Sequence, residues 1–203
     1  MTQAAQCTGA IIAGGRATRF GGTAKGLERV GGVRMIDRVA AALVESCDDL
    51  IVIANDAAAQ GWIPGARVVA DVRPGAGALG GLHAALANAR DAVLVLAWDS
   101  PFVPGGLMRA LRDAGEAAGA DAALPVSNAP QGFEPLCAWY RASCRATVER
   151  HLDSGDLRAG GWQREVASVR LDPSLWGDPD EIFFNVNSPE DIAMADAPAR
   201  RTT

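Results

Sequence analysis

The chain has 203 residues, of which 49% are hydrophobic and 21% charged, values typical of a globular protein. Its formal net charge of −5 argues against a general nucleic-acid-binding protein, whose surface would be basic. The length suits one large domain better than two small ones. The first residues lack a basic region followed by a hydrophobic one, and the apolar runs are only of strand length. We therefore expect a cytoplasmic protein with no secretory signal and no membrane span.

Apolar runs and amphipathic stretches alternate over about the first two-thirds of the chain. Strands are expected at 8–13, 50–54, 67–70, 92–98 and 120–126, and helices at 35–46, 79–88 and 104–117. Farther along, the pattern predicts strands at 136–140, 166–171 and 182–185, a helix at 142–153 and another that begins at 188. Such alternation produces a sheet covered by helices on both faces. The predicted fold class is therefore α/β, a three-layer α/β/α arrangement with a mostly parallel, Rossmann-like sheet.

The whole chain contains one lysine, Lys25, whereas the other 18 of its 19 Lys and Arg residues are arginines. This lysine lies in a glycine-rich segment, 13–27, that follows the first predicted strand. Lysine carries a compact charge on a flexible stem, which suits a phosphate that moves during a reaction. Backbone N–H groups of a glycine-rich turn also bind anions. We predict a phosphate-binding loop in which Arg19 and Lys25 surround a triphosphate; the alternative is a surface loop without a ligand.

The surroundings of this loop favour an anionic ligand, although the loop is not a P-loop. Between residues 16 and 38 there are six basic and two acidic side chains, a local excess of +4. The P-loop pattern needs Gly before its lysine and Ser or Thr after it, whereas the neighbours here are Ala24 and Gly26. The sequence therefore predicts a polyanionic small molecule held by another kind of loop.

Two carboxylates follow predicted strands. Asp99 ends the apolar run 92–98, and a carboxylate in that place is a natural ligand for Mg²⁺, which prefers one or two carboxylates together with phosphate oxygens and waters. The alternative is that Asp99 only caps the turn into the next helix. Asp71 ends the third predicted strand. Because ligands bind beyond the carboxyl ends of parallel strands, we expect Gly14, Asp71 and Asp99 to lie along one edge of the sheet.

The segment after Asp71 also satisfies a dinucleotide-binding pattern. Gly75, Gly77 and Gly80 match G-x-G-x-x-G, and Asp99 lies nineteen residues beyond the last of them. This pattern would indicate an oxidoreductase that binds NAD(P). Four residues, including Pro74, separate the strand from the first glycine, where the fingerprint needs an immediate tight turn. The dinucleotide hypothesis is therefore ranked second.

Two amides stand one residue apart near the end of the chain. In an extended segment Asn185 and Asn187 share a face, so both could offer carbonyl oxygens to a metal or a ligand. An equally good interpretation is that one caps the following helix while the other braces a turn. The two histidines, His83 and His151, lie in predicted helices and are expected to be structural or exposed to solvent.

Four motifs in the same order resemble those of the molybdenum cofactor guanylyltransferase family, the MobA-like nucleotidyltransferases. The resemblance spans about residues 8–195. The motifs are Ile12-Ala13-Gly14-Gly15 with Arg19 and Lys25, Asp71 with 77–81 and 84–86, Trp98-Asp99-Ser100-Pro101, and the segment from Asn185 to Ile192. The double glycine is similar to guanylyl-transferring members of the wider group, whereas cytidylyl-transferring enzymes carry Ala-Ala-Gly.

The chain departs from the family pattern at three positions. Ala24 stands where an Asp is usual, Ala78 replaces a Pro, and Trp98 replaces a Cys. The first departure bears on loop geometry or metal binding. The last would reshape the base or acceptor side of the site, so the departures concern the identity of the acceptor more than the transfer of a nucleotide.

The resemblance implies a nucleotide-diphospho-sugar transferase fold and a reaction that moves GMP from GTP onto the phosphate of molybdopterin, giving the guanine dinucleotide cofactor and pyrophosphate. It implies one nucleotidyltransferase domain over 1–203, with a nucleotide-binding half at about 8–126 and an acceptor-binding half at about 127–196. The implied catalytic residues are Lys25, Arg19 and Asp99, with Asp99 as the Mg²⁺ ligand. The implied nucleotide-binding residues are Ile12, Ala13, Gly14, Gly15, Arg19, Lys25, Asp71 and Asp99, and Asn185 and Asn187 would contact the acceptor or the metal.

The implied partners are GTP, molybdopterin and, among proteins, those of cofactor biosynthesis or the recipient molybdoenzymes. Neither nucleic acid nor a membrane is expected as a partner. Three alternatives stay open at this point: a nucleotidyltransferase that uses CTP or a sugar phosphate, a dinucleotide-binding oxidoreductase, and a non-catalytic relative that binds a nucleotide without turnover.

Overall fold

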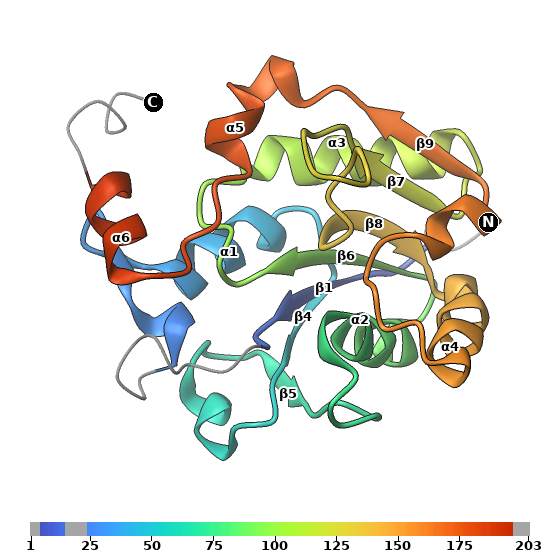
Figure 1. Ribbon diagram of the computed structural model, residues 1–203, viewed down its shortest axis with the longest axis horizontal. Coiled ribbons are helices and arrows are strands. Elements are labelled where there is room, and N and C mark those ends of the chain that lie inside the picture. Colours follow the sequence, from blue (N-terminus) through green and yellow to red (C-terminus); the bar gives the residue numbers. More distant parts are fainter. Residues whose placement is uncertain (1–4, 15–23, 197–203) are drawn as a thin grey trace.

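The computed structural model describes residues 5–14 and 24–196. Its centre is a seven-stranded sheet in the order β5-β4-β1-β6-β8-β7-β9 (Figure 1). The strands are β1 (Cys7–Ile12), β4 (Asp49–Ile53), β5 (Arg67–Val69), β6 (Ala92–Ala97), β7 (Ala122–Pro125), β8 (Cys137–Arg141) and β9 (Ser168–Leu171). The predicted alternation of strands and helices is thus confirmed, with boundaries that move by one or two residues at most strand ends.

The sheet is mostly parallel, as predicted. β1 pairs in parallel with β4 on one side and with β6 on the other, and β4 pairs in parallel with β5. Only β8 runs against its neighbours β6 and β7, and β9 is again parallel to β7. Because β8 (Cys137–Arg141) inserts between β6 and β7, the two halves expected at 8–126 and 127–196 share one continuous sheet.

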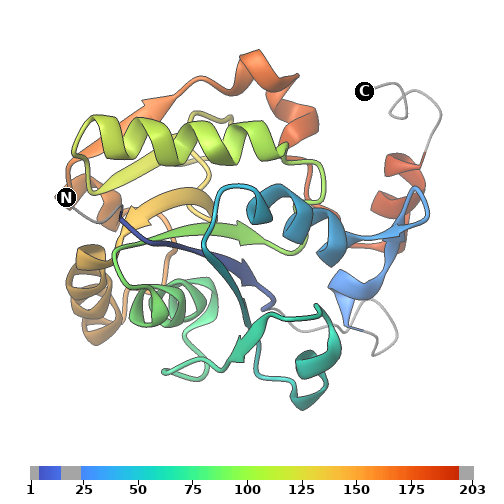
Figure 2. The ribbon, with the colours of Figure 1, turned by 180° about the vertical axis from the view of Figure 1, so that it is seen from behind.

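Two hydrophobic cores form because β1 is buried on both faces. Successive strand residues point to opposite faces, so Ile11 packs on one side of the sheet and Ile12 on the other. Helices α1 and α3 cover the first face, and α2 and α4 cover the second (Figures 1 and 2). The bounds are α1 (Met35–Val44), α2 (Gly77–Asn88), α3 (Gly105–Ala117) and α4 (Arg145–Ser154).

Short elements connect these layers. The strands β2 (Arg29–Val30) and β3 (Val33–Arg34) form a two-stranded antiparallel hairpin. Single 3₁₀ turns occur at η2 (Lys25–Leu27), η3 (Ala57–Gly61), η4 (Ala142–Cys144), η5 (Trp162–Glu165) and η6 (Pro173–Trp176). The described part of the chain closes with α5 (Pro179–Ile182), which packs in the same core as α1 and α3, and α6 (Pro189–Ala195), which lies beside the hairpin (Figure 1).

The strand predicted at 182–185 is wrong. Residues Pro179–Ile182 form the short helix α5 instead, and no strand is assigned to the residues that follow it in the described part of the chain. Asp178 caps this helix by accepting a hydrogen bond from the N–H of Asp180, and Pro179 occupies the first helical position. The apolar run that follows suggested a strand, but the Asp-Pro start signal determined the structure. The same kind of signal at Ser188-Pro189 correctly predicted α6.

The order of the strands reverses between β1 and β6. From β1 (Cys7–Ile12) the chain moves outward through β4 and β5, and then returns to the other side of β1 as β6 (Ala92–Ala97). In open α/β sheets the crevice at the carboxyl ends of the strands at such a reversal is where ligands bind. Among the described residues, no helix is long and apolar enough to cross a membrane.

Packing of α3 on the sheet depends on a glycine. A Cβ placed on Gly115 would lie 3.0 Å from Cδ2 of the buried Trp139 indole and closer still to Cε3. We therefore expect Gly115→Ala to lower the free energy of unfolding by about 2 kcal/mol, because so close a contact places the cost of overpacking near the upper end of its range, about 3 kcal/mol, and the gain in helix propensity offsets about 1 kcal/mol of it. Urea denaturation would measure it, with the exposed Ala117→Gln as a control; equal stability of both variants would contradict this packing argument.

Candidate active site

Lys25 and Asp99 face each other at the reversal of the sheet. Lys25 begins the 3₁₀ turn η2 beyond β1, and Asp99 follows the end of β6. The Nζ of Lys25 lies 2.6 Å from Oδ2 of Asp99, and the two side chains are 14% and 20% exposed. These residues are 74 positions apart in the sequence, and the parallel pairing of β1 with β6 brings their loops together. The predicted convergence of the glycine-rich loop and the carboxylate is therefore found in the structure.

Asn187 completes this cluster. Its Oδ1 accepts a second hydrogen bond from Lys25 Nζ, at 2.7 Å. The segment is fixed beside Asp99 because the N–H of the fully buried Val186 donates to the carbonyl of Asp99 at 2.9 Å. One residue earlier, Asn185 Oδ1 accepts a hydrogen bond from the hydroxyl of Ser100. The amide of Asn185 therefore contacts the loop that carries Asp99, and the amide of Asn187 contacts Lys25.

The alternative role of the two amides, as helix cap or turn brace, fits less well. The cap of α6 is Ser188, whose hydroxyl accepts from the N–H of Asp191 at 3.2 Å. Asp191 in turn accepts from the backbone N–H of Asn187 at 2.7 Å. This reciprocal capping arrangement holds the asparagine in place by its backbone and leaves its carboxamide for Lys25.

Asp71 lies at the same edge of the sheet but pairs differently. Its Oδ2 accepts from Nδ2 of Asn55 at 2.8 Å, and its backbone N–H donates to Oδ1 of the same asparagine. Its other oxygen lies 3.9 Å from where a Cβ on Gly81 of α2 would be. The sequence analysis missed Asn55. The available signal was its position, because it follows a buried strand, β4, just as Asp99 follows β6.

The backbone at the end of β1 is largely engaged in the sheet. The carbonyl of Ile12 accepts from the N–H of Trp98, and the N–H of Ala13 donates to the carbonyl of Ile53. Gly14 is exposed at the strand end. The predicted site residues Gly15 and Arg19 lie outside the described residues.

Three of the four described basic residues between 16 and 38 bond to groups outside the site. Arg16 lies outside the described residues. Arg29 donates to the carbonyl of Gly32, Arg34 forms a bidentate pair with Asp37, and Arg38 donates to the carbonyl of Val30. Lys25 is the described basic residue of this stretch that bonds to Asp99.

Trp98, one of the departures from the family pattern, is a buried residue. Its side chain is 4% exposed, stacks on Trp62 with ring centroids 5.6 Å apart, and packs against Gly26 beneath the lysine turn. The residue immediately before Asp99 is therefore part of the core. Ala24 packs partly buried against the same core.

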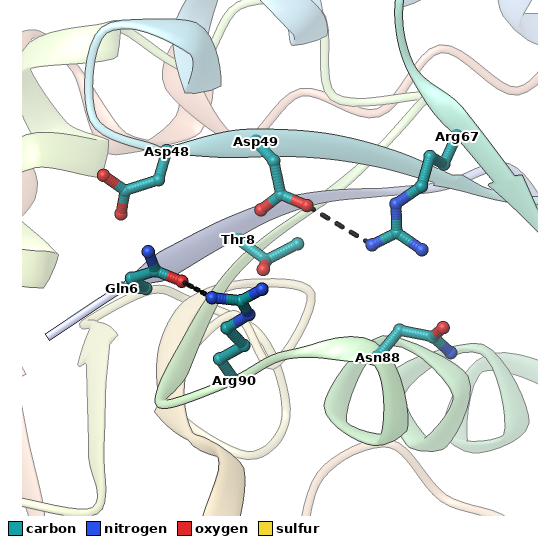
Figure 3. A pocket seen from close by; sticks show the side chains of 7 residues that line it. All are labelled: Gln6, Thr8, Asp48, Asp49, Arg67, Asn88 and Arg90. Atoms are coloured by element: carbon teal, nitrogen blue, oxygen red, sulfur yellow. Dashed lines mark hydrogen bonds and ion pairs between the residues drawn. The ribbon is translucent and has the colours of Figure 1, made fainter.

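A pocket of about 360 Å³ opens at the opposite edge of the sheet, where the strands begin (Figure 3). Its charged groups already have protein partners: Arg67 lies 3.3 Å from Asp49, Arg90 donates to the side chain of Gln6, and Asp48 accepts from the N–H of Cys7. The histidines are also engaged elsewhere: His83 is buried with its Nε2 3.0 Å from Glu149, and His151 Nε2 lies 2.6 Å from Glu165. This agrees with structural roles for both.

The oxygens around Lys25 fit a divalent cation. Among the described residues there is no group of three or more His, Cys, Asp and Glu side chains that could enclose a metal ion. Asp99 Oδ2 and Asn187 Oδ1 nevertheless converge on one positive charge, the ammonium of Lys25. One carboxylate and one neutral oxygen form the sparse hard-oxygen set that Mg²⁺ uses when phosphate and water supply its remaining ligands.

A lysine and a carboxylate that meet at the switch point of an α/β sheet are the features of a nucleotide-phosphate-binding protein. Comparison with known protein families identifies the class of nucleotide-binding protein more specifically. The profile of the MobA-like NTP transferase domain matches residues 9–169. The chain therefore belongs to this family of nucleotidyltransferases.

Individual relatives match over nearly the whole chain. A molybdenum cofactor guanylyltransferase of Desulfosudis oleivorans is 33% identical over 94% of both chains. A probable molybdenum cofactor guanylyltransferase of Chloroflexus aggregans is 36% identical over 94% of this chain and 93% of its own. The crystal structure of molybdopterin-guanine dinucleotide biosynthesis protein A of Archaeoglobus fulgidus superimposes with a TM-score of 0.77 at 26% identity, covering 93% of this chain and 96% of that one. The fold is the predicted nucleotide-diphospho-sugar transferase fold.

Because Lys25 is the only lysine in the chain, ¹⁵N-lysine labelling gives one side-chain ammonium signal. We expect this signal to be visible in the wild type, because two hydrogen bonds slow the exchange of its protons with water. Asp99→Ala should broaden it beyond detection, and Asn187→Ala should weaken it. Asp71→Ala is the control at the same edge, and an equal loss in that variant would contradict the specific pairing of Lys25 with Asp99.

Proposed function

We propose that this protein transfers GMP from GTP to the terminal phosphate of molybdopterin, which releases pyrophosphate and gives the guanine dinucleotide form of the cofactor. The observation that carries the proposal is the contact of Lys25 with Asp99 at the switch point of a sheet from the MobA-like NTP transferase family. The relatives named as molybdenum cofactor guanylyltransferases, which match end to end, support the choice of substrates. A cytoplasmic location is part of the proposal.

The reaction is a substitution at phosphorus. An oxygen of the acceptor phosphate forms a bond to the α-phosphorus of GTP, and the bond from that phosphorus to the oxygen bridging it to the β-phosphate breaks. The acceptor oxygen is already ionised at neutral pH, so no general base is required. Both reactants are anionic, and the protein contributes mainly charge neutralisation and alignment. This agrees with a site whose described side chains include a lysine, a carboxylate and amides but no histidine.

In this reaction Lys25 neutralises charge on the transferred phosphate, and Arg19 would hold the β- and γ-phosphates. Asp99 would hold a divalent ion, proposed to be Mg²⁺, with Asn187 as its second oxygen or as a contact to the acceptor. When bound, such an ion would screen negative charge on the phosphates. Asn185 is proposed to contact the acceptor, and its hydrogen bond with Ser100, one residue after Asp99, supports a place near the site.

The nucleoside is proposed to lie over Ile12, Ala13, Gly14 and Gly15, with Asp71 at the base or ribose. Asn55 donates to one oxygen of the Asp71 carboxylate and accepts from the backbone N–H of Asp71, which supports a role for the other carboxylate oxygen toward the ligand. Residues of about 8–126 would thus bind the nucleotide, and residues of about 127–196 the acceptor. Proteins of cofactor biosynthesis or recipient enzymes are proposed as protein partners.

The NAD(P) alternative has little structural support. β5 ends at Val69, and Gly75 follows six residues later in a separate turn, whereas the dinucleotide fingerprint needs its first glycine directly after the strand. β5 is also an edge strand of the sheet, away from the reversal between β1 and β6.

A thermal-shift panel separates the remaining candidates. GTP with Mg²⁺ should raise the melting temperature well beyond CTP, ATP, UTP or NADH, because ligand that binds only the folded state stabilises it in proportion to RT ln(1 + [L]/Kd). A larger shift with CTP would indicate a cytidylyltransferase, and one with NADH an oxidoreductase. GTP binding without pyrophosphate release in the presence of molybdopterin would indicate a non-catalytic relative.

Asp99→Ala should abolish pyrophosphate release, and Lys25→Ala should lower kcat by about 10²–10³-fold, the size expected for removing one preorganised charge from a transition state. Circular dichroism and thermal melting check that both variants are folded. Arg109→Ala, a surface change on α3, is the control with unchanged activity. Substantial turnover by Asp99→Ala would refute the assigned role of this carboxylate.

Lys25 and a metal ion compete for the same two oxygens in the free protein. Mg²⁺ alone should therefore give almost no thermal shift with the wild type, because the ammonium already occupies the space between Asp99 and Asn187. In Lys25→Ala the oxygens are free, and Mg²⁺ alone should stabilise the protein measurably. Titration calorimetry in the absence of nucleotide would test this directly, and tighter metal binding by the wild type than by Lys25→Ala would contradict it.

A further inference from the structure

The 3₁₀ turn that carries Lys25 lies directly on an indole ring. A Cβ placed on Gly26 would be 2.9 Å from Cδ2 of Trp98 and closer still to Cε3. Gly26 is buried, and Trp98 is 4% exposed. The backbone next to the only lysine therefore touches the ring face, with no space for a side chain between them.

The indole is itself held firmly in place. It forms a stacked pair with Trp62, with ring centroids 5.6 Å apart and an interplanar angle of 26°. The backbone N–H of Trp98 donates to the carbonyl of Ile12 at 3.2 Å, which ties the residue to the end of β1. One residue later the chain reaches Asp99. The ring under Lys25 and the carboxylate bonded to Lys25 thus belong to consecutive residues.

Apart from the two hydrogen bonds of the Lys25 ammonium itself, no side-chain cap fixes the backbone of this turn in the described part of the chain. The residue at the cap position, Ala24, packs against the core instead. The Nε1 of Trp98 is buried and has no hydrogen-bond partner in the described part of the chain. The contact between ring and glycine is accordingly one of shape alone, and a rigid aromatic face restricts the turn more than a flexible side chain would.

We propose that Trp98 is a positioning residue, whose indole face seats the Gly26 backbone and thereby sets the place of the Lys25 ammonium relative to Asp99 and Asn187. This inference rests on the proposed function where it concerns the reaction. The placement of the Lys25 ammonium by Trp98 does not depend on which nucleotide the protein uses. A residue that acts in this way affects the step in which charge is neutralised more than it affects ground-state binding, because displacements near 1 Å cost about 10²-fold in rate.

The test compares two single variants, one that adds a methyl group and one that removes the ring, with the double variant. Gly26→Ala forces a methyl group against the ring and should lower kcat about 10–100-fold, with a change in the KM for GTP of less than about threefold. Trp98→Leu removes the ring and should lower kcat about tenfold, because the turn loses its seat. The double variant, with a methyl group added and a ring removed, should recover at least about tenfold in kcat over Gly26→Ala. General destabilisation would instead make the two losses add.

The chain provides a matched control. Trp139 is also buried with an unpartnered Nε1 among the described residues, and it touches Gly115 of α3 in the same way. Gly115→Ala and Trp139→Leu should lower the melting temperature and leave kcat unchanged. Equal losses of kcat in the two pairs of variants would overturn the proposal, since both contacts would then act only through stability.

The ammonium signal of ¹⁵N-labelled Lys25 tests the inference without any turnover. It should shift or broaden in Gly26→Ala and in Trp98→Leu, return toward its wild-type position in the double variant, and stay unchanged in the Trp139 variants. An unchanged signal in Gly26→Ala would overturn the proposal. If that variant does not fold, Trp98→Phe replaces it, with the same expected displacement of the signal. A wild type that releases no pyrophosphate would refute the proposed function alone, because this readout does not depend on activity.

Discussion

The arrangement of the site depends on one ion pair, in which a single ammonium holds a carboxylate and an amide together. Lys25, Asp99 and Asn187 come from three regions of the chain, and each side chain carries a group that is costly to leave unpaired in a partly buried place. In the free protein these groups satisfy each other. A ligand must therefore offer replacements for the contacts that it breaks, and a triphosphate with a dication offers both: anionic oxygens for the lysine and positive charge for the carboxylate.

With the ligands proposed above, this exchange would make the site selective for an anion and a metal ion that bind together. An anion alone would release Lys25 but leave Asp99 without its cation, and a metal ion alone would compete with an ammonium that is tethered in place. Only the combination restores every pairing. The topology of the sheet makes the exchange possible, since β1 and β6 are neighbours at the reversal of strand order and their loops leave the same edge.

The sequence was sufficient for the sheet, the helices and the meeting of Lys25 with Asp99. Buried strands with apolar residues on both faces, such as Ala92–Ala97, give strong signals, and the carboxyl ends of parallel strands necessarily share an edge. Local sequence patterns did not predict the features that depend on capping or on tertiary contacts. The strand expected at 182–185 is replaced by α5 because a capped Asp-Pro start outweighs a short apolar run. Asn55 was missed because a lone amide after a strand is common. The burial of Trp98 under the lysine turn follows from packing that no spacing in the sequence encodes.

Asn187, the second hydrogen-bond partner of Lys25, lies 162 residues farther along the chain. All seven strands of the sheet are complete at Leu171, sixteen residues before Asn187. Contacts of such high sequence separation form late, because closure of a long loop costs entropy that only an existing scaffold offsets. During synthesis the sheet can therefore assemble before the amide arrives, so that a nascent chain possesses the scaffold of the enzyme while the cluster of Lys25, Asp99 and Asn187 is still unfinished.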